Sequence, residues 1–371
     1  MDVTVLSAGH DVADARVHRL VSAMARLGLA VEVLGLGDSN AAPSDAVAVR
    51  TWARRRPAGR LALALRQATT ARGDVLLAPD PDTTLTALLV ARATGRRVVA
   101  DVHEDYRALL RDRSWARGVT GVLAGALAAA AERAAAACDL TVVADEHVPP
   151  LRARCRLVVR NLPDPSMLPE PAAPGPGPRA VYIGDVRASR GLFAMIDAVS
   201  AAPGWELDVV GPVAPADAPA LTARLDSDGV RGRVRVHGRM PPARAWEVAR
   251  GAWCGLALLE DTPAFRSAVP SKLYEYLACG LPVVVTDLPA QASLVRRTGA
   301  GVTVPTDAPG PAAARVLREW SAGGGYREVR DRALQASPAF RRPTAYRDAA
   351  EAVRRLVEAA PRRSGQERRV S

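Results

Sequence analysis

An alternation of short apolar runs with helical patterns occurs twice along the chain, and it limits the fold more than any other feature. In the first half, apolar runs at residues 3–7, 31–36 and 75–78 are strand-like, and segments with a helical period separate them. Residues 161–179 interrupt the alternation with seven prolines and two glycines, and it restarts at residue 180. The pattern predicts two α/β domains, each a doubly wound parallel sheet with helices on both faces.

The same pattern sets the predicted domain boundaries. Residues 1–160 form a Rossmann-like domain, 161–179 a Pro/Gly-rich linker, and 180–343 a second Rossmann-like domain. A helix over 344–360 is expected to pack back on the N-terminal domain, and 361–371 form a disordered basic tail. Ligands of such sheets bind at the carboxyl ends of the strands, so we expect the site in the cleft between the domains.

The net charge of the chain is weak evidence about its binding partners. Among 371 residues, 50 are basic and 39 acidic, giving a net charge of +11, and every basic residue except Lys272 is arginine. This skew is typical of G+C-rich genomes, such as those of actinobacteria. The arginines are spread through both halves without a cluster, so we expect no nucleic-acid partner. Peripheral contact with an anionic membrane stays open. Because arginine occupies every other basic position, the one lysine indicates a position that needs a compact ammonium; the alternative is that arginine is absent there by chance.

The cysteines and the N-terminus bear on the compartment. Cys138, Cys155, Cys254 and Cys279 show no C-x-x-C spacing, which fits a reduced cytoplasm and does not fit a zinc site. Residues 1–6 are strand-like and do not resemble a signal peptide, and no stretch of 18 strongly apolar residues occurs. We expect a cytoplasmic protein, and contact with the inner face of the membrane stays open.

The segment 270–285 carries the clearest chemical motif, P-S-K-L-Y-E-Y-L-A-C-G-L-P-V-V-V. Ser271 is expected to cap a helix, with Lys272 in its first turn. A helix N-terminus offers free N–H groups and a positive dipole end, which suit a diphosphate. Glu275 lies one turn further along, within reach of a ribose. The alternative is an ordinary capped helix with a solvated Lys–Glu pair.

Three further segments carry motifs. The segment 6–28 contains Ser7, Gly9, His10, Asp14 and Arg16; Asp80-Pro81-Asp82 and D-V-H-E-D at 101–105 follow; and 182–191 contains Y-I-G-D-V-R-A-S-R-G. Together with 270–285 they resemble the retaining nucleotide-sugar glycosyltransferases of family 4, which have the GT-B fold of two Rossmann-like domains facing across a cleft. The resemblance covers nearly the whole chain, and the D-V-H-E-D signature resembles a polysaccharide-biosynthesis branch.

The resemblance implies donor-binding roles in the second domain. Glu275 would hold the ribose hydroxyls and Arg190 the diphosphate. The family's second basic residue is missing at position 185, where this chain has Asp185, and Arg187 could substitute. Ser267 stands where the family's first glutamate contacts the transferred sugar. The implied donor-binding set is Gly9, Arg187, Arg190, His237, Gly238, Arg239, Ser267, Ser271, Lys272, Leu273 and Glu275. Within it, 237–239 would line the base pocket, and backbone N–H groups at 272–273 would hold the β-phosphate.

The resemblance also implies roles in the first domain. His103 would lie beside the donor sugar and form the catalytic set with Arg190 and Lys272; a buried, hydrogen-bonded histidine is the alternative. The implied acceptor-side residues are His10, Asp14, Arg16, Asp80 and Glu104. The sequence Asp80-Pro81-Asp82 is similar to a D-x-D metal motif, but its match to the family's loop favours an acceptor-side or structural role. We expect neither a metal nor another cofactor.

The implied reaction is transfer of a sugar from a nucleoside-diphosphate sugar to an acceptor hydroxyl, with retention of configuration. The acceptor would be a cell-surface glycan, a lipid-linked glycan or a small natural product such as an antibiotic core. No pair of carboxylates is placed as nucleophile and acid, so we expect front-face displacement. The alternatives are a sugar-nucleotide epimerase of the same fold and a non-catalytic nucleotide-sugar-binding partner subunit.

Overall fold

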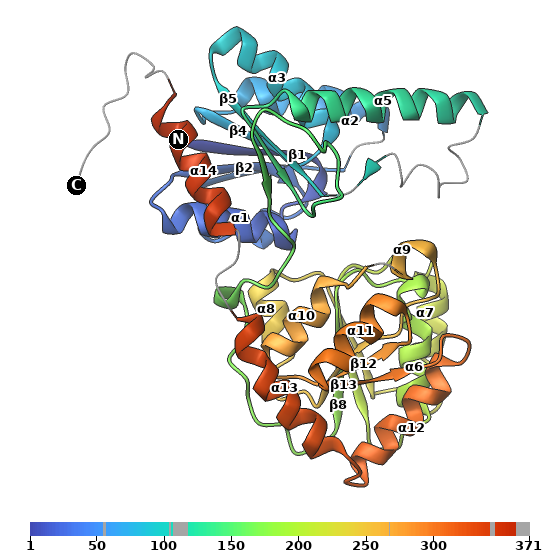
Figure 1. The fold of residues 1–371 in the computed structure, drawn as a ribbon. Coiled ribbons are helices and arrows are strands. Elements are labelled where there is room, and N and C mark those ends of the chain that lie inside the picture. Colours follow the sequence, from blue (N-terminus) through green and yellow to red (C-terminus); the bar gives the residue numbers. More distant parts are fainter. Residues whose placement is uncertain (55–56, 104, 107–117, 267, 342–345, 361–371) are drawn as a thin grey trace. The chain divides into compact units, whose positions relative to one another are not determined.

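The chain folds into two compact units, each built on one parallel sheet (Figure 1). The computed structural model describes residues 1–54, 57–103, 105–106, 118–266, 268–341 and 346–360. The first unit comprises Met1–Asn161 and Thr344–Ser371, and the second comprises Leu162–Pro343. The chain therefore passes to the second unit once and returns for its last helix.

The first unit contains a seven-stranded sheet with the spatial order β3-β2-β1-β4-β5-β6-β7. Its strands are β1 (Val3–Asp11), β2 (Val31–Leu36), β3 (Ala48–Trp52), β4 (Val75–Ala78), β5 (Arg97–Val102), β6 (Leu140–Val143) and β7 (Arg156–Val158). The helices are α1 (Ala15–Arg26), α2 (Pro57–Thr70), α3 (Pro81–Thr94), α5 (Gly118–Ala136) and α14 (Tyr346–Glu358), with a short 3-10 turn η1 (Ser39–Ala41). Apolar clusters cover both faces of the sheet. The last helix packs on α1, since Tyr346 and Val353 share a core with Val17 and Leu20.

The second unit contains a six-stranded parallel sheet with the order β10-β9-β8-β11-β12-β13. Its strands are β8 (Arg179–Ile183), β9 (Glu206–Val210), β10 (Val234–Gly238), β11 (Cys254–Ala257), β12 (Val283–Thr286) and β13 (Gly301–Val304). Its helices are α6 (Leu192–Ser200), α7 (Ala218–Leu225), α8 (Pro242–Glu247), α9 (Pro263–Arg266), α10 (Ser271–Ala278), α11 (Pro289–Thr298), α12 (Pro309–Ser321) and α13 (Tyr326–Phe340), with 3-10 turns η2 (Pro165–Met167) and η3 (Ala188–Arg190). Both sheets therefore have the strand order of doubly wound Rossmann-like folds.

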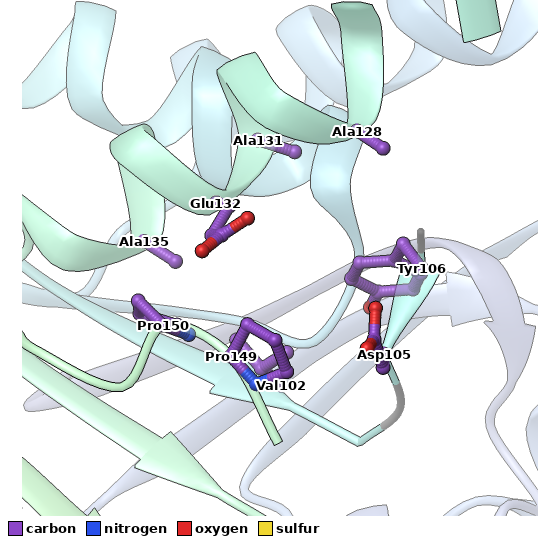
Figure 2. A pocket seen from close by; sticks show the side chains of 9 residues that line it. All are labelled: Val102, Asp105, Tyr106, Ala128, Ala131, Glu132, Ala135, Pro149 and Pro150. Atoms are coloured by element: carbon purple, nitrogen blue, oxygen red, sulfur yellow. The ribbon is translucent and has the colours of Figure 1, made fainter. Parts of the chain in front are cut away.

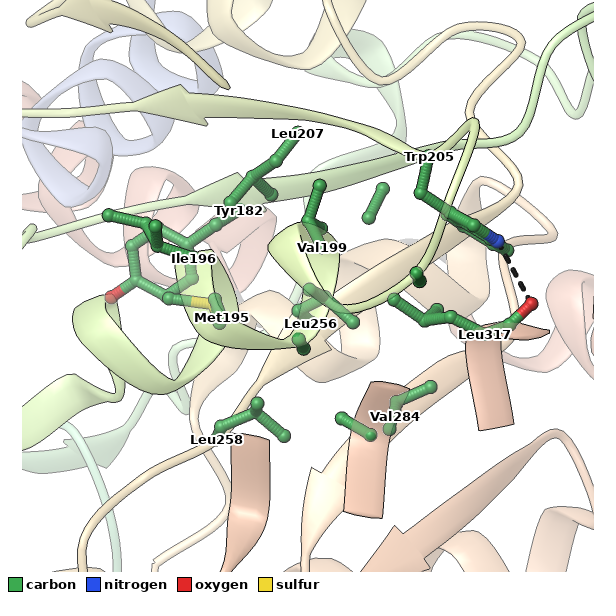
Figure 3. Close-up of a cluster of buried hydrophobic side chains, with 14 of the residues drawn as sticks. Tyr182, Met195, Ile196, Val199, Trp205, Leu207, Leu256, Leu258, Val284 and Leu317 are labelled. Atoms are coloured by element: carbon green, nitrogen blue, oxygen red, sulfur yellow. Dashed lines mark hydrogen bonds between the residues drawn. The ribbon is translucent and has the colours of Figure 1, made fainter. Parts of the chain in front are cut away.

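The core of the second unit is built around a buried indole. Figure 3 shows Trp205 among aliphatic side chains of the sheet and of α6, with its Nε1–H donating to the Leu317 carbonyl oxygen at 2.9 Å. This bond satisfies the one polar atom of a large buried ring. Among the described residues of both units, no helix is both long enough and apolar enough to cross a membrane.

The segment expected to be a linker lies along the second unit. The Gly175 amide donates to the Gly251 carbonyl at 2.8 Å, and Trp253 Nε1 donates to the Gly175 carbonyl at 3.0 Å. Arg341 donates to the Pro169 carbonyl at 3.0 Å. Prolines lack an N–H but keep their carbonyl, so an extended Pro-rich strap can still be bound through its acceptors. Residues 162–178 are thus attached to one unit along their length.

The structure adds elements to those that the sequence predicts. The strand-like runs at 31–36 and 75–78 are strands with these bounds, and the run at 3–7 extends to Asp11. Beyond Gly299 the second unit contains β13, α12 and α13, none of which the sequence analysis places. The predicted tail at 361–371 lies outside the described residues.

Candidate functional site

In the first unit, polar side chains gather where β1, β4 and β5 end. Asp80 follows β4 and is almost fully buried. Its carboxylate lies 2.7 Å from His10 Nδ1 and accepts hydrogen bonds from the Ser7 hydroxyl and the Gly9 amide, both at 2.9 Å. A Cβ at Gly9 would lie 2.5 Å from the Asp80 carboxylate, so this approach requires glycine. The Asp80 side chain therefore fixes the end of β1.

The pKa values of this pair are shifted apart. Burial raises the pKa of Asp80, but the hydrogen bond and charge of His10 outweigh burial and hold it at about 2. Burial lowers the pKa of His10, but Asp80 outweighs it and raises the pKa to about 9. The two side chains thus form an ion pair at neutral pH.

A second buried pair lies at the end of β5. The Arg16 guanidinium donates to Asp101 through Nε at 2.9 Å and Nη2 at 2.5 Å, and its Nη1 donates to the Val159 carbonyl at 2.9 Å. Burial raises the pKa of Asp101, but Arg16 and His103 outweigh burial and hold it well below its usual range. His103 Nε2 lies 2.8 Å from the Asp101 carboxylate. One carboxylate thus orients both an arginine and a histidine.

The two histidines face each other across the strand ends. The ring centroids of His10 and His103 are 5.2 Å apart, and each ring has its own aspartate. Both side chains stay partly exposed, at 35% and 17%. This edge of the sheet therefore exposes two imidazoles to solvent, and the buried carboxylates of Asp80 and Asp101 fix their orientation.

The predicted acceptor-side residues have different positions. Arg16 is 4% exposed and Asp80 is 2% exposed, so both support the histidines from the interior. The Asp14 carboxylate caps α1 by accepting from the amides of Arg16 and Val17. Glu104 lies outside the described residues. Of the five predicted residues, His10 is the one in the described part of the chain whose ring combines exposure with a fixed position.

The Asp80-Pro81-Asp82 sequence makes contacts within the protein. Asp82 pairs with Arg60 at 2.8 Å, while Asp80 binds the end of β1. Among the described residues, no three His, Cys, Asp or Glu side chains gather as a metal-binding group.

A small cavity lies beside this cluster, between the end of β5 and α5 (Figure 2). Val102, Asp105, Tyr106, three alanines and Glu132 of α5, and the cis-linked Pro149–Pro150 line it. Its volume of about 20 Å³ suits one water molecule. It is too small for a sugar.

In the second unit, the corresponding cluster is cationic. Lys272 lies in the first turn of α10, is 5% exposed, and places its Nζ 3.5 Å from the centroid of the Tyr182 ring. Among the described residues, no atom forms a hydrogen bond with this ammonium. Gly184 has a φ of +140°, and a Cβ there would lie 2.9 Å from Nζ. Burial, together with the charge of Arg190, holds the pKa of Lys272 well below its usual value.

Two arginines share one carboxylate next to this lysine. Asp185 Oδ2 lies 2.5 Å from Arg187 Nη2 and 3.6 Å from Arg190 Nε. The Arg190 guanidinium also lies over the Phe265 ring, 5.8 Å from its centroid. The Tyr182 hydroxyl donates to the Asp185 backbone carbonyl at 2.6 Å, which fixes the start of the loop. From the sequence, Asp185 stands out only as the replacement of an expected basic residue, and no role was predicted for the Tyr182 side chain.

The start of α10 differs from the expected cap. Pro270, and not Ser271, is the N-cap residue, and no side-chain hydrogen bond caps the helix. The Leu273 amide, expected to hold a phosphate, donates to the Pro270 carbonyl at 3.0 Å, and the Leu273 side chain lies in the core. Glu275 is buried one turn further along. Ser267 lies outside the described residues.

The predicted base-pocket residues lie at the end of β10, the edge strand two places from β8. His237 Nε2 lies 2.7 Å from the Asp208 carboxylate, which also accepts from Arg179 and Arg235. Burial raises the pKa of Asp208, but these hydrogen bonds outweigh burial and lower it. Gly238 ends the strand with a φ of +71°, and Arg239 follows it. His237 is thus oriented from within the sheet.

With this geometry in place, comparison with known proteins gives one family. Residues 177–321 match the family of glycosyl transferases group 1. The match lies in the second unit and includes Arg187, Arg190, Lys272 and Glu275. No curated protein sequence matches the chain.

Solved structures show the fold of the whole chain. Sucrose-phosphate synthase from Thermosynechococcus elongatus matches with a TM-score of 0.67 at 14% identity, covering 97% of this chain and 100% of that one. HepE from Anabaena, in complex with UDP-glucose, matches with a TM-score of 0.63 at 14% identity, covering 96% and 98%. WaaG, a glycosyltransferase involved in lipopolysaccharide biosynthesis, matches with a TM-score of 0.60 at 15% identity, covering 99% and 100%. The chain has the GT-B fold, as the sequence analysis predicted.

Proposed function

We propose that this chain is a retaining glycosyltransferase that moves a sugar from a nucleoside-diphosphate sugar to an acceptor hydroxyl. The buried ammonium of Lys272 carries the proposal. A charged group held away from water without a hydrogen bond is costly, and an incoming phosphate oxygen would relieve that cost. The match to glycosyl transferases group 1 covers this lysine, and the similar HepE structure holds UDP-glucose.

The charges of the second unit suit the departure of a nucleoside diphosphate. Negative charge develops on the leaving phosphate as the bond to the sugar breaks, and cations fixed beforehand stabilise it. Arg187, Arg190 and Lys272 supply these cations, and the first turn of α10 adds its dipole. In the proposed front-face route, a donor phosphate oxygen takes the proton of the acceptor hydroxyl. Three cations at the phosphate also support our proposal that no metal is required.

The first unit would supply the sugar-side groups. We propose that His103, oriented by Asp101, contacts the transferred sugar and that His10 lies on the acceptor side. The proposed acceptor is a cell-surface glycan, a lipid-linked glycan or a small natural product. Substitution of His103 would therefore reduce transfer without reducing nucleotide binding, because the diphosphate cations belong to the other unit.

Calorimetric titration of the full chain with uridine, guanosine and thymidine diphosphates tests the donor site. We expect one of them to bind best, and we expect Glu275→Ala to weaken it by about tenfold through loss of a charge-assisted hydrogen bond. Glu206→Ala is the matched control, since Glu206 is an exposed glutamate of the same unit. Titrations in EDTA and in Mg²⁺ should agree. If no nucleotide binds to the wild type, the proposed function is wrong.

A further inference from the structure

Asp185 is an acidic residue in the middle of a cationic cluster. Its carboxylate contacts Arg187 at 2.5 Å and approaches Arg190 at 3.6 Å. The family resemblance places a basic residue at this position, so the charge here is reversed. A carboxylate bound to arginines in this way occupies the positions that a phosphate oxygen would take.

The third cation of the cluster stays outside this arrangement. Lys272 lies against the Tyr182 ring and has no hydrogen-bond partner among the described residues. Asp185 therefore pairs with the two arginines of the cluster but forms no hydrogen bond with the buried Lys272 ammonium. The arrangement resembles an anion site in which an internal anion fills the arginine portion.

We propose that Asp185 is a built-in counter-anion that competes with the donor diphosphate for Arg187 and Arg190, so that the nucleotide product is released faster. This inference rests on the proposed function. In the free protein the carboxylate keeps the two guanidinium groups close together. A diphosphate must displace it or accept its repulsion, and both effects weaken binding.

The position of Asp185 allows this displacement. The Tyr182 hydroxyl holds its backbone carbonyl, so the loop stays in place while the side chain turns away. The side chains of Asp185 and Arg187 are 32% and 46% exposed, so solvent screens their pair and its loss costs little. The opposite role, in which Asp185 positions the arginines for the phosphate, predicts weaker binding when its charge is removed.

Asp185→Asn separates the two roles. We expect the variant to bind uridine diphosphate about tenfold more tightly and to release it more slowly, because a repulsive charge next to the phosphate is gone. Asp185→Glu keeps the charge and should return binding toward the wild-type value. Asp197→Asn is the matched control, since it removes a carboxylate paired with Arg224 elsewhere in the same unit. Equal or weaker binding by Asp185→Asn overturns the proposal.

A second ligand tests the counter-anion independently of the proposed glycosyltransferase function. Inorganic pyrophosphate offers the same charge without base, ribose or sugar, and the proposal predicts tighter binding by Asp185→Asn here too. Tighter pyrophosphate binding with no nucleotide binding would support the counter-anion and contradict the transferase. Equal nucleotide binding by wild type and variant would contradict the counter-anion alone. Absence of binding by either protein to either probe would contradict both.

Discussion

The two units carry polar clusters at the same place in their sheets, the carboxyl ends of central strands, but the charges are satisfied to different degrees. In the first unit, Asp80 pairs with His10, and Asp101 pairs with Arg16 and His103. In the second, Arg187 and Arg190 share the Asp185 carboxylate, and the buried Lys272 lies within the influence of Glu275 and Asp185, so the cations still outnumber the carboxylates.

This difference indicates a division of roles. A balanced network of buried hydrogen bonds holds its members rigidly and has little to gain from another ion. A cluster with excess cations gains from an anion, since that anion replaces the water lost by burial. The first cluster is therefore suited to orienting neutral groups such as sugar hydroxyls, and the second to holding a phosphate.

The largest expected effect comes from breaking the cluster of the first unit, called the balanced cluster because Asp80 and Asp101 pair with His10, Arg16 and His103. Asp101→Asn would leave the Arg16 guanidinium buried without its counter-charge, and we expect a loss of about 3 kcal/mol in the free energy of unfolding. Urea denaturation measures it. Asp82→Asn is the control, because its partner Arg60 is partly exposed and the pair should contribute less than about 1 kcal/mol. Equal losses in the two variants would contradict the contrast between buried and screened pairs.

The next effect, on binding, comes from the cationic cluster. Lys272→Met keeps the apolar stem and removes the ammonium, so we expect diphosphate binding to weaken about 100-fold, as measured by calorimetry. Lys272→Arg should not restore binding, since even a Cβ at Gly184 would lie only 2.9 Å from Nζ, and a guanidinium is larger than the ammonium that fits there. Tight binding by Lys272→Met would refute the role given to this lysine.

Lys272→Met should also change how the stability of the ligand-free protein depends on pH. The pKa of Lys272 is lower when the protein is folded than when it is unfolded, so the unfolded chain binds more protons between the two values. Stability should therefore rise as pH increases through the range below 10.5, and Lys272→Met should reduce this slope. Urea denaturation of the ligand-free protein across alkaline pH measures the difference.

The sequence predicts the repeated sheet well because its signal is local. Buried central strands such as Val31–Leu36 are continuous apolar runs, and each can be found without knowing its neighbours. The edge strands β3 and β13 escape prediction because their residues are only half-buried and their apolar pattern is weak. The helix α13 also escapes, since it accommodates Pro338 inside its last turn.

The site is predictable only in part, because its pairings depend on tertiary contacts. The motif around Lys272 is local, and the sequence alone places this lysine in the first turn of a helix, where the structure has it. Asp101 and Arg16 are 85 positions apart, and nothing in either segment specifies their bond. The same applies to Ser7 and Asp80, which are 73 positions apart. Arg16 and Asp80, two of the residues predicted to lie on the acceptor side, are buried and support the histidines from the interior.

The smallest expected effect tests how much the balanced cluster depends on protonation. The pKa of His10 rises from 6.5 to about 9 on folding, so its contribution is complete below 6.5 and is lost as pH rises toward 9. The pKa of Asp80 falls from 3.8 to about 2, so its contribution is present above 3.8 and is lost as pH falls toward 2. The pair therefore stabilises the first unit most between these limits.

His10→Asn should remove the alkaline part of this profile. Because a third of the His10 side chain is exposed, we expect a change below about 1 kcal/mol in the free energy of unfolding. Urea denaturation at acidic, neutral and alkaline pH measures it, with His147→Asn, an exposed histidine, as the control. Wild-type and His10→Asn profiles that run parallel from pH 6.5 to 9 would mean that the imidazole does not carry the charge that balances Asp80, and the contrast between the two clusters would then rest on Arg16 and Asp101 alone.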